Sequence, residues 1–437
     1  MTALLNEIPA EDLCPALGHP VLSSAAFLNE VSSRYPEAVS LAAGRPYDGF
    51  FDPAELGDNL LAYQEHLTER EGLSPGEVTR RLFQYGRTAG HIHDLIAELI
   101  ANDEGIHVPP ESIVVVNGAQ EGMLITLRAL CNAPGDVLLT TSPAYIGILG
   151  AARLLGIRSA AVAEDEDGVD PAAVAAVARR LRGSGQRPRA LYLVPDFSNP
   201  TGHTLSAERR GALLEVAEEE GLLILEDSPY GFLADPPLPS LKSLDTTGRV
   251  IHIGSFAKTC FPGARVGYVV ADQVVRHADG SRSTLADQLA LIRSMITVNT
   301  SSVAQAVIGG ILVRARCRLR EHNAERIRFY RENLAALLRA LDRRLPDGVR
   351  HRLGVSWNAP AAGFFVVLRV PFPADENLLT VSARDYGVVW TPMSYFFADG
   401  GGSRAMRLSC SSVSAADLEE GARRLAQLVL DTAQMRR

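Results

Sequence analysis

The sequence predicts an α/β protein with a large domain, in which a mostly parallel sheet lies between layers of helices, and a smaller α/β lobe towards the C-terminus. Two features lead to this prediction. Short apolar segments alternate with helical patterns through the middle of the chain, which is typical of a parallel sheet covered on both faces. The 437 residues also exceed what one compact core usually holds, which favours two lobes.

The apolar segments of the middle part have the length and composition of buried strands. One helical pattern between them, Ala207–Glu220, follows Ser206, a residue type that caps helix N-termini. Ligands of such sheets bind beyond the carboxyl ends of the strands, and Asn199, Asp227 and Lys258 each follow a predicted strand. The predicted strands are Ile113–Val116, Val137–Thr140, Ala190–Val194, Leu222–Leu225 and Val250–Ile253.

The pattern changes after the last of these strands. A helical, arginine-rich segment from Ile311 to Leu345 is predicted to form one connecting helix that ends at Leu345-Pro346-Asp347-Gly348. The C-terminal lobe follows, with strands at Phe364–Val370 and Met406–Ser409 and a closing helix from Ala415. The first forty or so residues are expected to pack with this lobe. The predicted division is an N-terminal arm with part of the small domain (1–60), a large domain (61–315), and the connecting helix with the small domain (316–437).

Composition and charge argue against several classes of protein. A net charge of −8 argues against a nucleic-acid partner and suits an enzyme that binds a small metabolite. The five cysteines form no C-x-x-C pair and the ten histidines show no ligand spacing, so we expect a reducing compartment and no metal site. No apolar run reaches the roughly 20 residues that span a bilayer, and no signal pattern begins the chain. These features predict a cytoplasmic protein that binds no membrane.

A lysine in the segment Ser255–Gly267 carries the strongest chemical signal. Lys258 follows an apolar strand, with Ser255 just before it and Arg265 one short loop later. A lysine amine condenses with carbonyls, and its pKa falls when it is desolvated. Arg265 offers a fork of donors that matches phosphate oxygens. The arrangement favours a Schiff-base lysine beside a phosphate held by Ser255 and Arg265; the alternative is a lysine and an arginine that lie in a surface loop.

Two further strand ends carry polar residues. Glu226 and Asp227 are consecutive, so only one of them can face a given ligand. A buried carboxylate needs a partner because an unpaired buried charge is costly, and a protonated pyridine nitrogen is such a partner. The alternative is an acid that caps the next turn. Asn199 precedes Pro200, which restricts the backbone of Asn199 and aims its amide in a set direction.

These segments, taken in order, resemble the class I/II aminotransferases of fold type I, which depend on pyridoxal 5'-phosphate (PLP). Pro195–Gly202 and Glu226–Tyr230 are most similar to the aminoadipate or multisubstrate branch of the family. The resemblance extends from Gly44 to Arg407 and implies a fold-type I PLP-dependent transferase. The main motifs are S-x-[SA]-K-x-x-x-P-G-x-R-x-G at Ser255–Gly267, D-x-x-Y at Asp227–Tyr230, N-P-[TG]-G at Asn199–Gly202 and G-[SA]-Q at Gly118–Gln120.

The resemblance implies PLP as the cofactor and a role for each residue around it. Lys258 would form the Schiff base and then move the substrate Cα proton, first as base and then as acid. Asp227 would hold the ring nitrogen, and Tyr145 would stack on the ring. Ala119 stands where many members carry serine or threonine, so backbone amides at the helix N-terminus would hold the phosphate. The implied cofactor contacts are Gly118, Ala119, Gln120, Tyr145, Asn199, Asp227, Tyr230, Ser255, Lys258, Arg265 and, across a dimer interface, Tyr85.

The substrate contacts are also implied by the resemblance. Arg407 would bind the α-carboxylate of the amino acid with a bidentate fork, and the alternative for it is an internal salt bridge. Arg293 lies in a segment that in relatives reaches across the dimer, and it is a further candidate for a distal carboxylate. Arg45 and Arg293 favour a substrate with a polar or charged tail. The full set of implied substrate contacts is Gly44, Asn199, Arg407 and Arg45.

The expected activity is transfer of the α-amino group of an L-amino acid to a 2-oxo acid by a ping-pong mechanism through Lys258. The expected assembly is a homodimer with active sites at the interface, acting in amino-acid metabolism or biosynthesis. Elimination, cyclisation or oxidation of an amino acid on the same scaffold remains an alternative. A non-catalytic PLP-binding regulatory module would need a basic helix-turn-helix segment, and the residues ahead of Gly44 show no such pattern. The stretch Glu65–Arg81 is polar and longer than usual, and its role is left open.

Overall fold

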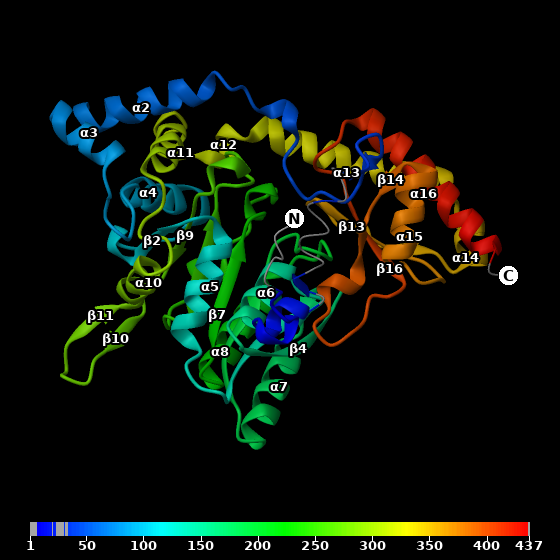
Figure 1. Cartoon of the computed structure of the whole chain (residues 1–437), viewed down its shortest axis with the longest axis horizontal. Coiled ribbons are helices and arrows are strands. Elements are labelled where there is room, and N and C mark those ends of the chain that lie inside the picture. Colours follow the sequence, from blue (N-terminus) through cyan, green and yellow to red (C-terminus); the bar gives the residue numbers. More distant parts are fainter. Residues whose placement is uncertain (1–6, 20, 23–29, 31–33, 436–437) are drawn as a thin grey trace, which may run out of the picture.

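The computed structural model describes residues 7–19, 21–22, 30 and 34–435. In this part the chain forms a large sheet covered by helices and a smaller C-terminal lobe, and helix α13 (Ala324–Arg344) runs along the top of the molecule between them (Figure 1). The predicted α/β architecture is confirmed. Within the described ranges, no helix has both the length and the apolar character needed to cross a membrane.

The large sheet contains eight strands of the described chain in the order β2-β9-β8-β7-β6-β3-β4-β5. Neighbouring strands from β8 to β4 are parallel, whereas β9 runs antiparallel to β2 and β8, and β5 runs antiparallel to β4. All five predicted strands are present, and β4, β5 and β9 were not among them. The bounds are β2 (Ile113–Val116), β3 (Asp136–Ser142), β4 (Arg158–Asp165), β5 (Gly168–Val169), β6 (Arg187–Leu193), β7 (Leu223–Ser228), β8 (Val250–Ser255) and β9 (Gly267–Val270).

Helices cover both faces of this sheet because successive strand residues point to opposite sides. On one face Leu138, Ala190 and Leu225 pack with α5 (Ala119–Leu130), α6 (Ile146–Leu154) and α10 (Leu285–Ser294). On the other, their neighbours Val137, Leu191 and Ile224 pack with α7 (Pro171–Gly183) and α8 (Ala207–Glu219). The predicted cap of α8 is present, since Ser206 Oγ accepts a hydrogen bond from the Arg209 amide at 3.2 Å.

The prediction of one connecting helix from Ile311 to Leu345 is wrong. Helix α11 (Ser302–Arg314) ends early, a short helix α12 (Leu319–His322) follows, and only then does α13 begin. Arg316 and Cys317 adopt φ values of 52° and 49°, in the left-handed region that breaks a helix. The turn lets α11 stay packed on α2 (Glu55–Glu69) while α13 leaves for the small lobe. The predicted end of α13 at Leu345-Pro346 is confirmed, and α14 (Asp347–Leu353) follows it.

The small lobe has an antiparallel sheet in the order β12-β13-β16-β15, against which α13 and the closing helix α16 (Ala415–Met435) pack. Strand β1 (Val39–Ser40) pairs with β14 (Val388–Val389), so the chain just ahead of Gly44 packs with this lobe as predicted. The prediction is wrong for the described residues nearer the start, because Val21 lies in the core beneath α6; residues 1–6, 20, 23–29 and 31–33 lie outside the description. The lobe's strands are β12 (Ser356–Trp357), β13 (Phe365–Arg369), β15 (Thr391–Pro392) and β16 (Ala405–Ser409).

The stretch Glu65–Arg81 forms the end of α2, a turn and most of α3 (Pro75–Phe83). Ser74 and Glu77 form a capping box at the start of α3. The stretch therefore lengthens a helical arm that lies at the edge of the large domain, at the upper left of Figure 1. The other described α-helices and strands are α4 (His93–Glu104), α9 (Leu241–Leu244), α15 (Glu376–Val381), β10 (Val274–Arg276) and β11 (Arg282–Thr284).

Candidate active site

A cavity of about 380 Å³ lies at the carboxyl ends of the parallel strands and reaches the small lobe. It brings together residues from positions 42 to 407 of the chain. Most of the residues singled out from the sequence line it, which places the predicted site where an open parallel sheet binds its ligands. The lining residues among those predicted are Gly44, Arg45, Ala119, Gln120, Tyr145, Asn199, Asp227, Tyr230, Ser255, Lys258, Arg265 and Arg407.

Lys258 lies half-buried on the cavity wall, in the loop that follows β8. Its Nζ donates a hydrogen bond to the carbonyl oxygen of Gly44 at 2.6 Å. Burial, together with the charges of Arg407 and Arg265, lowers the pKa of Lys258 to about 8. An appreciable fraction of this amine is therefore neutral near neutral pH, which is the form that attacks carbonyls and accepts protons.

Asp227 lies one residue before the end of β7 and is buried, with its carboxylate at the cavity. Its Oδ2 accepts a hydrogen bond from the Tyr192 hydroxyl at 2.6 Å, while its Oδ1 is buried and has no hydrogen-bond partner among the described residues. Burial raises the pKa of Asp227 to about 6, although the Tyr192 bond and nearby positive charge oppose the rise. Glu226 points to the other side of the sheet, where it accepts hydrogen bonds from the amides of residues 241 and 242.

The N-terminus of α5 and the Arg265 side chain form one end of the cavity. Gly118 precedes α5 with a φ of 76°, and a Cβ at this position would lie 2.6 Å from Arg265 Nη2. Only glycine therefore lets the guanidinium approach the helix N-terminus. Ala119 opens the helix, and its first amides have no intrahelical acceptor. Gln120 turns its side-chain amide to the Gly147 carbonyl at 2.8 Å.

Arg407 comes from β16 of the small lobe, is buried, and lines the cavity. Its Nη1 donates to Asn199 Oδ1 at 2.6 Å and its Nη2 donates to the Ala42 carbonyl at 2.7 Å. The guanidinium carbon lies 4.4 Å and 4.9 Å from the ring centres of Phe365 and Phe396. Arg407 Nε is buried without a hydrogen-bond partner among the described residues. The described partners of this arginine are an amide, a carbonyl and a hydroxyl, with no carboxylate among them, so the internal salt bridge considered for it is absent there.

Two tyrosines, Tyr145 and Tyr230, also line the cavity. Tyr145 lies at the start of α6 and Tyr230 follows β7. Tyr230 packs edge-on against Phe364 and Phe365, with ring centres 5.2 Å and 5.9 Å apart. Burial raises the pKa of both hydroxyls above the ordinary value of a tyrosine, so they stay protonated and can donate.

Of three further predicted residues, only Arg293 contradicts its expected role. Arg293 is fully buried, forms an ion pair with Glu121 at 3.3 Å and donates to Thr300, so its assignment to a substrate carboxylate is wrong. Tyr85 is 85% exposed and lies outside the cavity of its own chain. Arg45 lines the mouth of the cavity, where it is largely exposed and lies 3.3 Å from Asp48.

The sequence reasoning missed Tyr192, Phe365, Phe396 and Ala42. The signal for Tyr192 was available, because a hydroxyl in a buried strand requires a hydrogen-bond partner. Ala42 lies two residues before Gly44, whereas Phe365 and Phe396 lie far from the sequence motifs; all three reach the site through the packing of the small lobe. In the described residues, no group of histidine, cysteine, aspartate or glutamate side chains is arranged to hold a metal ion.

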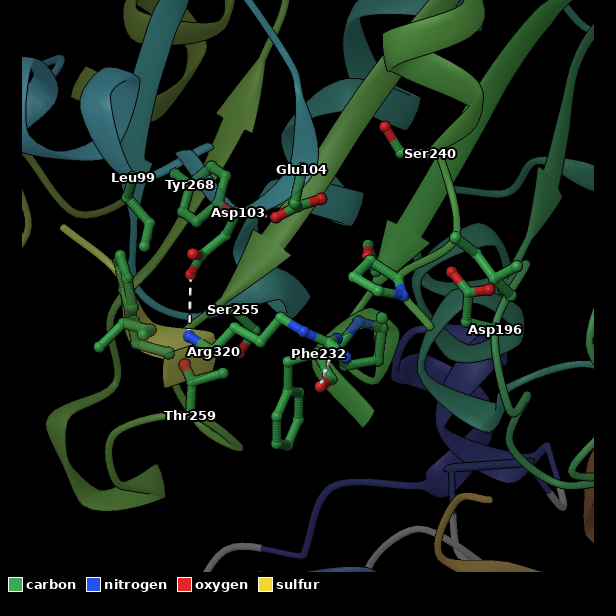
Figure 2. Close-up of a pocket in the computed structure, with 17 residues that line it drawn as sticks. Leu99, Asp103, Glu104, Asp196, Phe232, Ser240, Ser255, Thr259, Tyr268 and Arg320 are labelled. Atoms are coloured by element: carbon green, nitrogen blue, oxygen red, sulfur yellow. Dashed lines mark hydrogen bonds between the residues drawn. The ribbon is translucent and has the colours of Figure 1, made fainter. Parts of the chain in front are cut away.

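A second, smaller cavity of about 60 Å³ lies behind the lysine loop (Figure 2). Asp103, Glu104 and Asp196 contribute carboxylates to it, and Ser255 lines both this cavity and the larger one. Burial raises the pKa of Glu104 to about 6. Figure 2 shows Arg320 extended along this cavity, where its Nη1 donates to the carbonyl of Phe232. The volume suits a few water molecules and is too small for an amino acid with its cofactor.

Comparison with known proteins identifies the family. A family model described as aminotransferase class I and II matches residues 67–425. The chain belongs to this family. It is 46% identical over 433 residues to the (S)-3,5-dihydroxyphenylglycine transaminase of Amycolatopsis orientalis, which covers 99% of this chain and 97% of the relative.

Two solved aminotransferases have the same fold. The kynurenine aminotransferase of Pyrococcus horikoshii, in complex with PMP, superposes with a TM-score of 0.81 at 26% identity, over 97% of this chain and 98% of that one. LysN, the α-aminoadipate aminotransferase of Thermus thermophilus, complexed with N-(5'-phosphopyridoxyl)-L-leucine, gives a TM-score of 0.76 at 28% identity, over 94% and 98%. The protein is a fold-type I, PLP-dependent aminotransferase that acts on amino acids and 2-oxo acids, as the sequence predicted.

The cavity of this aminotransferase fits PLP. The partnerless Asp227 Oδ1 needs a donor, which a protonated ring nitrogen provides. The start of α5 with Arg265 offers amides and a guanidinium to a phosphate. When bound, PLP supplies an electron sink for the charge left on Cα when a substrate loses its proton.

Proposed function

We propose that this aminotransferase acts on amino acids of the arylglycine class, in which an aromatic ring is attached directly to Cα. The observation that carries the proposal is the 46% identity, over 99% of the chain, to a transaminase named for (S)-3,5-dihydroxyphenylglycine. The cavity supports it, because Met123, Tyr145, Ile146 and Phe396 give it apolar and aromatic walls. Such walls suit a flat ring held close to the reacting carbon.

The residues of the cavity divide the work of the reaction. Lys258 would take up the substrate Cα proton at Nζ, which its lowered pKa of about 8 supports. Asp227 would hold the ring nitrogen of PLP through Oδ1. Tyr230 and Asn199 would donate to the ring hydroxyl, and Tyr145 would stack on the ring. Ser255, Arg265 and the backbone of Gly118, Ala119 and Gln120 would hold the phosphate.

Arg407 binds the α-carboxylate of the substrate. Its unpaired Nε and its position between two phenylalanine rings support this role, since a buried guanidinium gains most from a bidentate carboxylate. Asn199 holds the Arg407 guanidinium in place and also contacts the substrate α-carboxylate. The Gly44 backbone lies beside the substrate. Because one amino acid must leave as its 2-oxo acid before the second 2-oxo acid binds at the same arginine, the order of reaction is ping-pong.

A substrate panel tests the proposed class. We expect kcat/KM for (S)-3,5-dihydroxyphenylglycine to exceed that for 2-aminoadipate by at least about 100-fold, because the apolar walls offer a distal carboxylate no cation other than the largely exposed Arg45. Arg45 is the cation at the mouth, so Arg45→Gln should lower activity on 2-aminoadipate and leave activity on the arylglycine nearly unchanged. A higher kcat/KM for 2-aminoadipate or kynurenine would contradict the proposal.

The working unit is a homodimer in which Tyr85 reaches the site of the other chain. The exposed apolar side chains Phe83, Tyr85, Met295 and Val298 support this assembly, because large apolar surfaces on soluble proteins usually mark interfaces. The loop that holds Tyr85 lies against the start of α11, where a Cβ on Gly86 would be 3.9 Å from Ser302 Oγ.

Mixing two inactive variants tests this assembly. Tyr85→Ala and Lys258→Ala should each be nearly inactive alone, but a mixed dimer contains one site with both residues intact. Random reassortment of equal amounts should therefore restore about a quarter of the wild-type activity. Light scattering should give twice the mass of one chain at micromolar concentration. A monomer, or a mixture without restored activity, would contradict the interface role of Tyr85.

The proposed location is the cytoplasm, in amino-acid biosynthesis. All five cysteines are free thiols, and four of them are buried, which suits a reducing compartment. The proposed division into 1–60, 61–315 and 316–437 is supported by a hydrophobic core in which Leu41 and Ala42 pack with residues between Leu334 and Ala433 of the C-terminal lobe. The proposed partners are small metabolites, and neither nucleic acid nor membrane, in keeping with the net charge of −8.

A further inference from the structure

Tyr192 lies on β6, the strand next to β7, and is 1% exposed. The register of the two parallel strands pairs Tyr192 with Leu225, two residues before Asp227. Residues two apart on a strand share a face and are separated by about 6.6 Å. A tyrosine side chain spans that offset, and the Tyr192 hydroxyl reaches Asp227 Oδ2 at 2.6 Å. The contact is thus built by the register of the sheet.

The hydrogen bond has a fixed direction. Burial and the neighbouring Asp227 charge hold the pKa of Tyr192 well above its ordinary value, so the hydroxyl is protonated and donates. It occupies Oδ2 and leaves Oδ1, which has no other partner among the described residues, for the ring nitrogen of PLP. The two oxygens of one buried carboxylate are in this way assigned to two different partners.

We propose that Tyr192 is a positioning residue for amino transfer: its hydroxyl fixes the orientation of the Asp227 carboxylate and stabilises its charged form, so that the proton shared with the cofactor stays on the ring nitrogen. A hydrogen bond to the charged form of an acid favours that form. Without it, a carboxyl group buried in apolar surroundings takes up the proton more readily. A neutral ring accepts less charge from Cα, so the rate falls for every amino acid, whichever substrate class the enzyme uses.

Tyr192→Phe tests this role, because it removes one oxygen and keeps the ring in the core. In the protein without PLP, we expect the pKa of Asp227 to rise from about 6 by about one unit, the effect of losing one hydrogen bond to a charged group. Carbon-13 NMR of aspartate-labelled protein measures it, with Asp227→Asn to assign the signal. In the loaded enzyme, the nitrogen-15 shift of labelled PLP should move towards the unprotonated value. A shift of one pKa unit corresponds to a tenfold factor, so we expect kcat to fall about 10-fold. The KM for the amino donor should stay nearly unchanged.

Tyr386→Phe is the matched control. It also removes a tyrosine hydroxyl that donates to an aspartate, Asp431 at 3.0 Å, but in the small lobe. It should leave the Asp227 pKa, the ring-nitrogen shift and kcat at their native values.

Placing 3-fluorotyrosine at position 192 gives a change of opposite sign. The more acidic hydroxyl donates more strongly, so the pKa of Asp227 should fall while the side chain keeps its shape. Native values of the Asp227 pKa and of the ring-nitrogen shift in folded Tyr192→Phe would overturn the proposal. If that variant does not fold, an unchanged Asp227 pKa in the fluorotyrosine protein would overturn it instead.

Discussion

Lys258→Ala is expected to lower kcat by at least about 10⁴-fold, because it removes both the nucleophilic amine and the group that moves the Cα proton. The fold should survive, since the half-buried side chain makes one hydrogen bond, to the Gly44 carbonyl. Lys258→Arg should be similarly inactive, because a guanidinium keeps the positive charge but does not release its proton. A small amine such as ethylamine should restore part of the activity of Lys258→Ala by entering the space that the side chain leaves.

The composition of the chain makes the attachment of PLP easy to locate. Lys242 and Lys258 are the only two lysines in the sequence. Lys242 lies away from the cavity, where its Nζ is 2.6 Å from Asp272 Oδ1. After borohydride reduction of the loaded enzyme, peptide mass spectrometry should find the cofactor on the peptide with Lys258 and leave the peptide with Lys242 unmodified. Activity of Lys258→Arg above a few per cent, or cofactor on Lys242, would contradict the assignment.

Asp227→Asn is expected to reduce kcat by about 1,000-fold, comparable to the loss of a preorganised electrostatic group in other active sites. The amide matches the carboxylate in shape but cannot hold a proton on the ring nitrogen by charge. The same change should make the protein without PLP more stable near neutral pH. This follows because the native protein buries a charged carboxylate whose Oδ1 has no described partner.

The pH dependence gives the sign and size of that stabilisation. The pKa of Asp227 is about 6 in the folded protein against an ordinary value of 3.8, so between these pH values the folded state binds more protons than the unfolded state. Stability is therefore lost as the pH rises through this window. The shift corresponds to roughly 3 kcal/mol, which Asp227→Asn should recover above about pH 6.

Urea unfolding of the protein without PLP measures the effect. The difference in unfolding free energy between Asp227→Asn and the native protein should grow by roughly 3 kcal/mol from pH 4 to pH 8. Asp431→Asn, which alters an acid of the small lobe that is bonded to Tyr386, serves as the control and should not reproduce this increase. Parallel pH profiles for Asp227→Asn and the native protein would show that the buried charge carries no such cost.

Local patterns predicted the strands of the large sheet because each is a short apolar run buried on both faces. They did not predict β9. Gly267–Val270 directly follows the lysine loop, and this strand forms by pairing with β2 and β8, which only the assembled sheet brings to its two sides. They also joined α11 to α13, because the residues between them have helical composition. The helix is interrupted between α11 and α13 by the left-handed backbone at Arg316 and Cys317. This turn lets α11 pack on the large domain while α13 packs on the small lobe.

The residues of the active site, like the strands, could be predicted from the sequence only in part. Asn199, Asp227 and Lys258 were found together because parallel strands bring their carboxyl ends to one edge of the sheet. Arg293 was misassigned, because its partner Glu121 lies 172 residues away along the chain. The role of Tyr85 stays a prediction that depends on a second copy of the chain.

The sequence by itself determined the family, the cofactor and the set of residues that follow the strands, since each depends on residues that are close neighbours along the chain. Tertiary structure decided which of those residues share one cavity with Ala42, Gly44 and Arg407. The Gly44 carbonyl meets Lys258, and Arg407 meets Asn199 and Ala42, only when the small lobe docks on the large sheet. It also decided that Asp227 keeps one oxygen free, because that depends on the register of β6 against β7, which the residues of neither strand reveal alone.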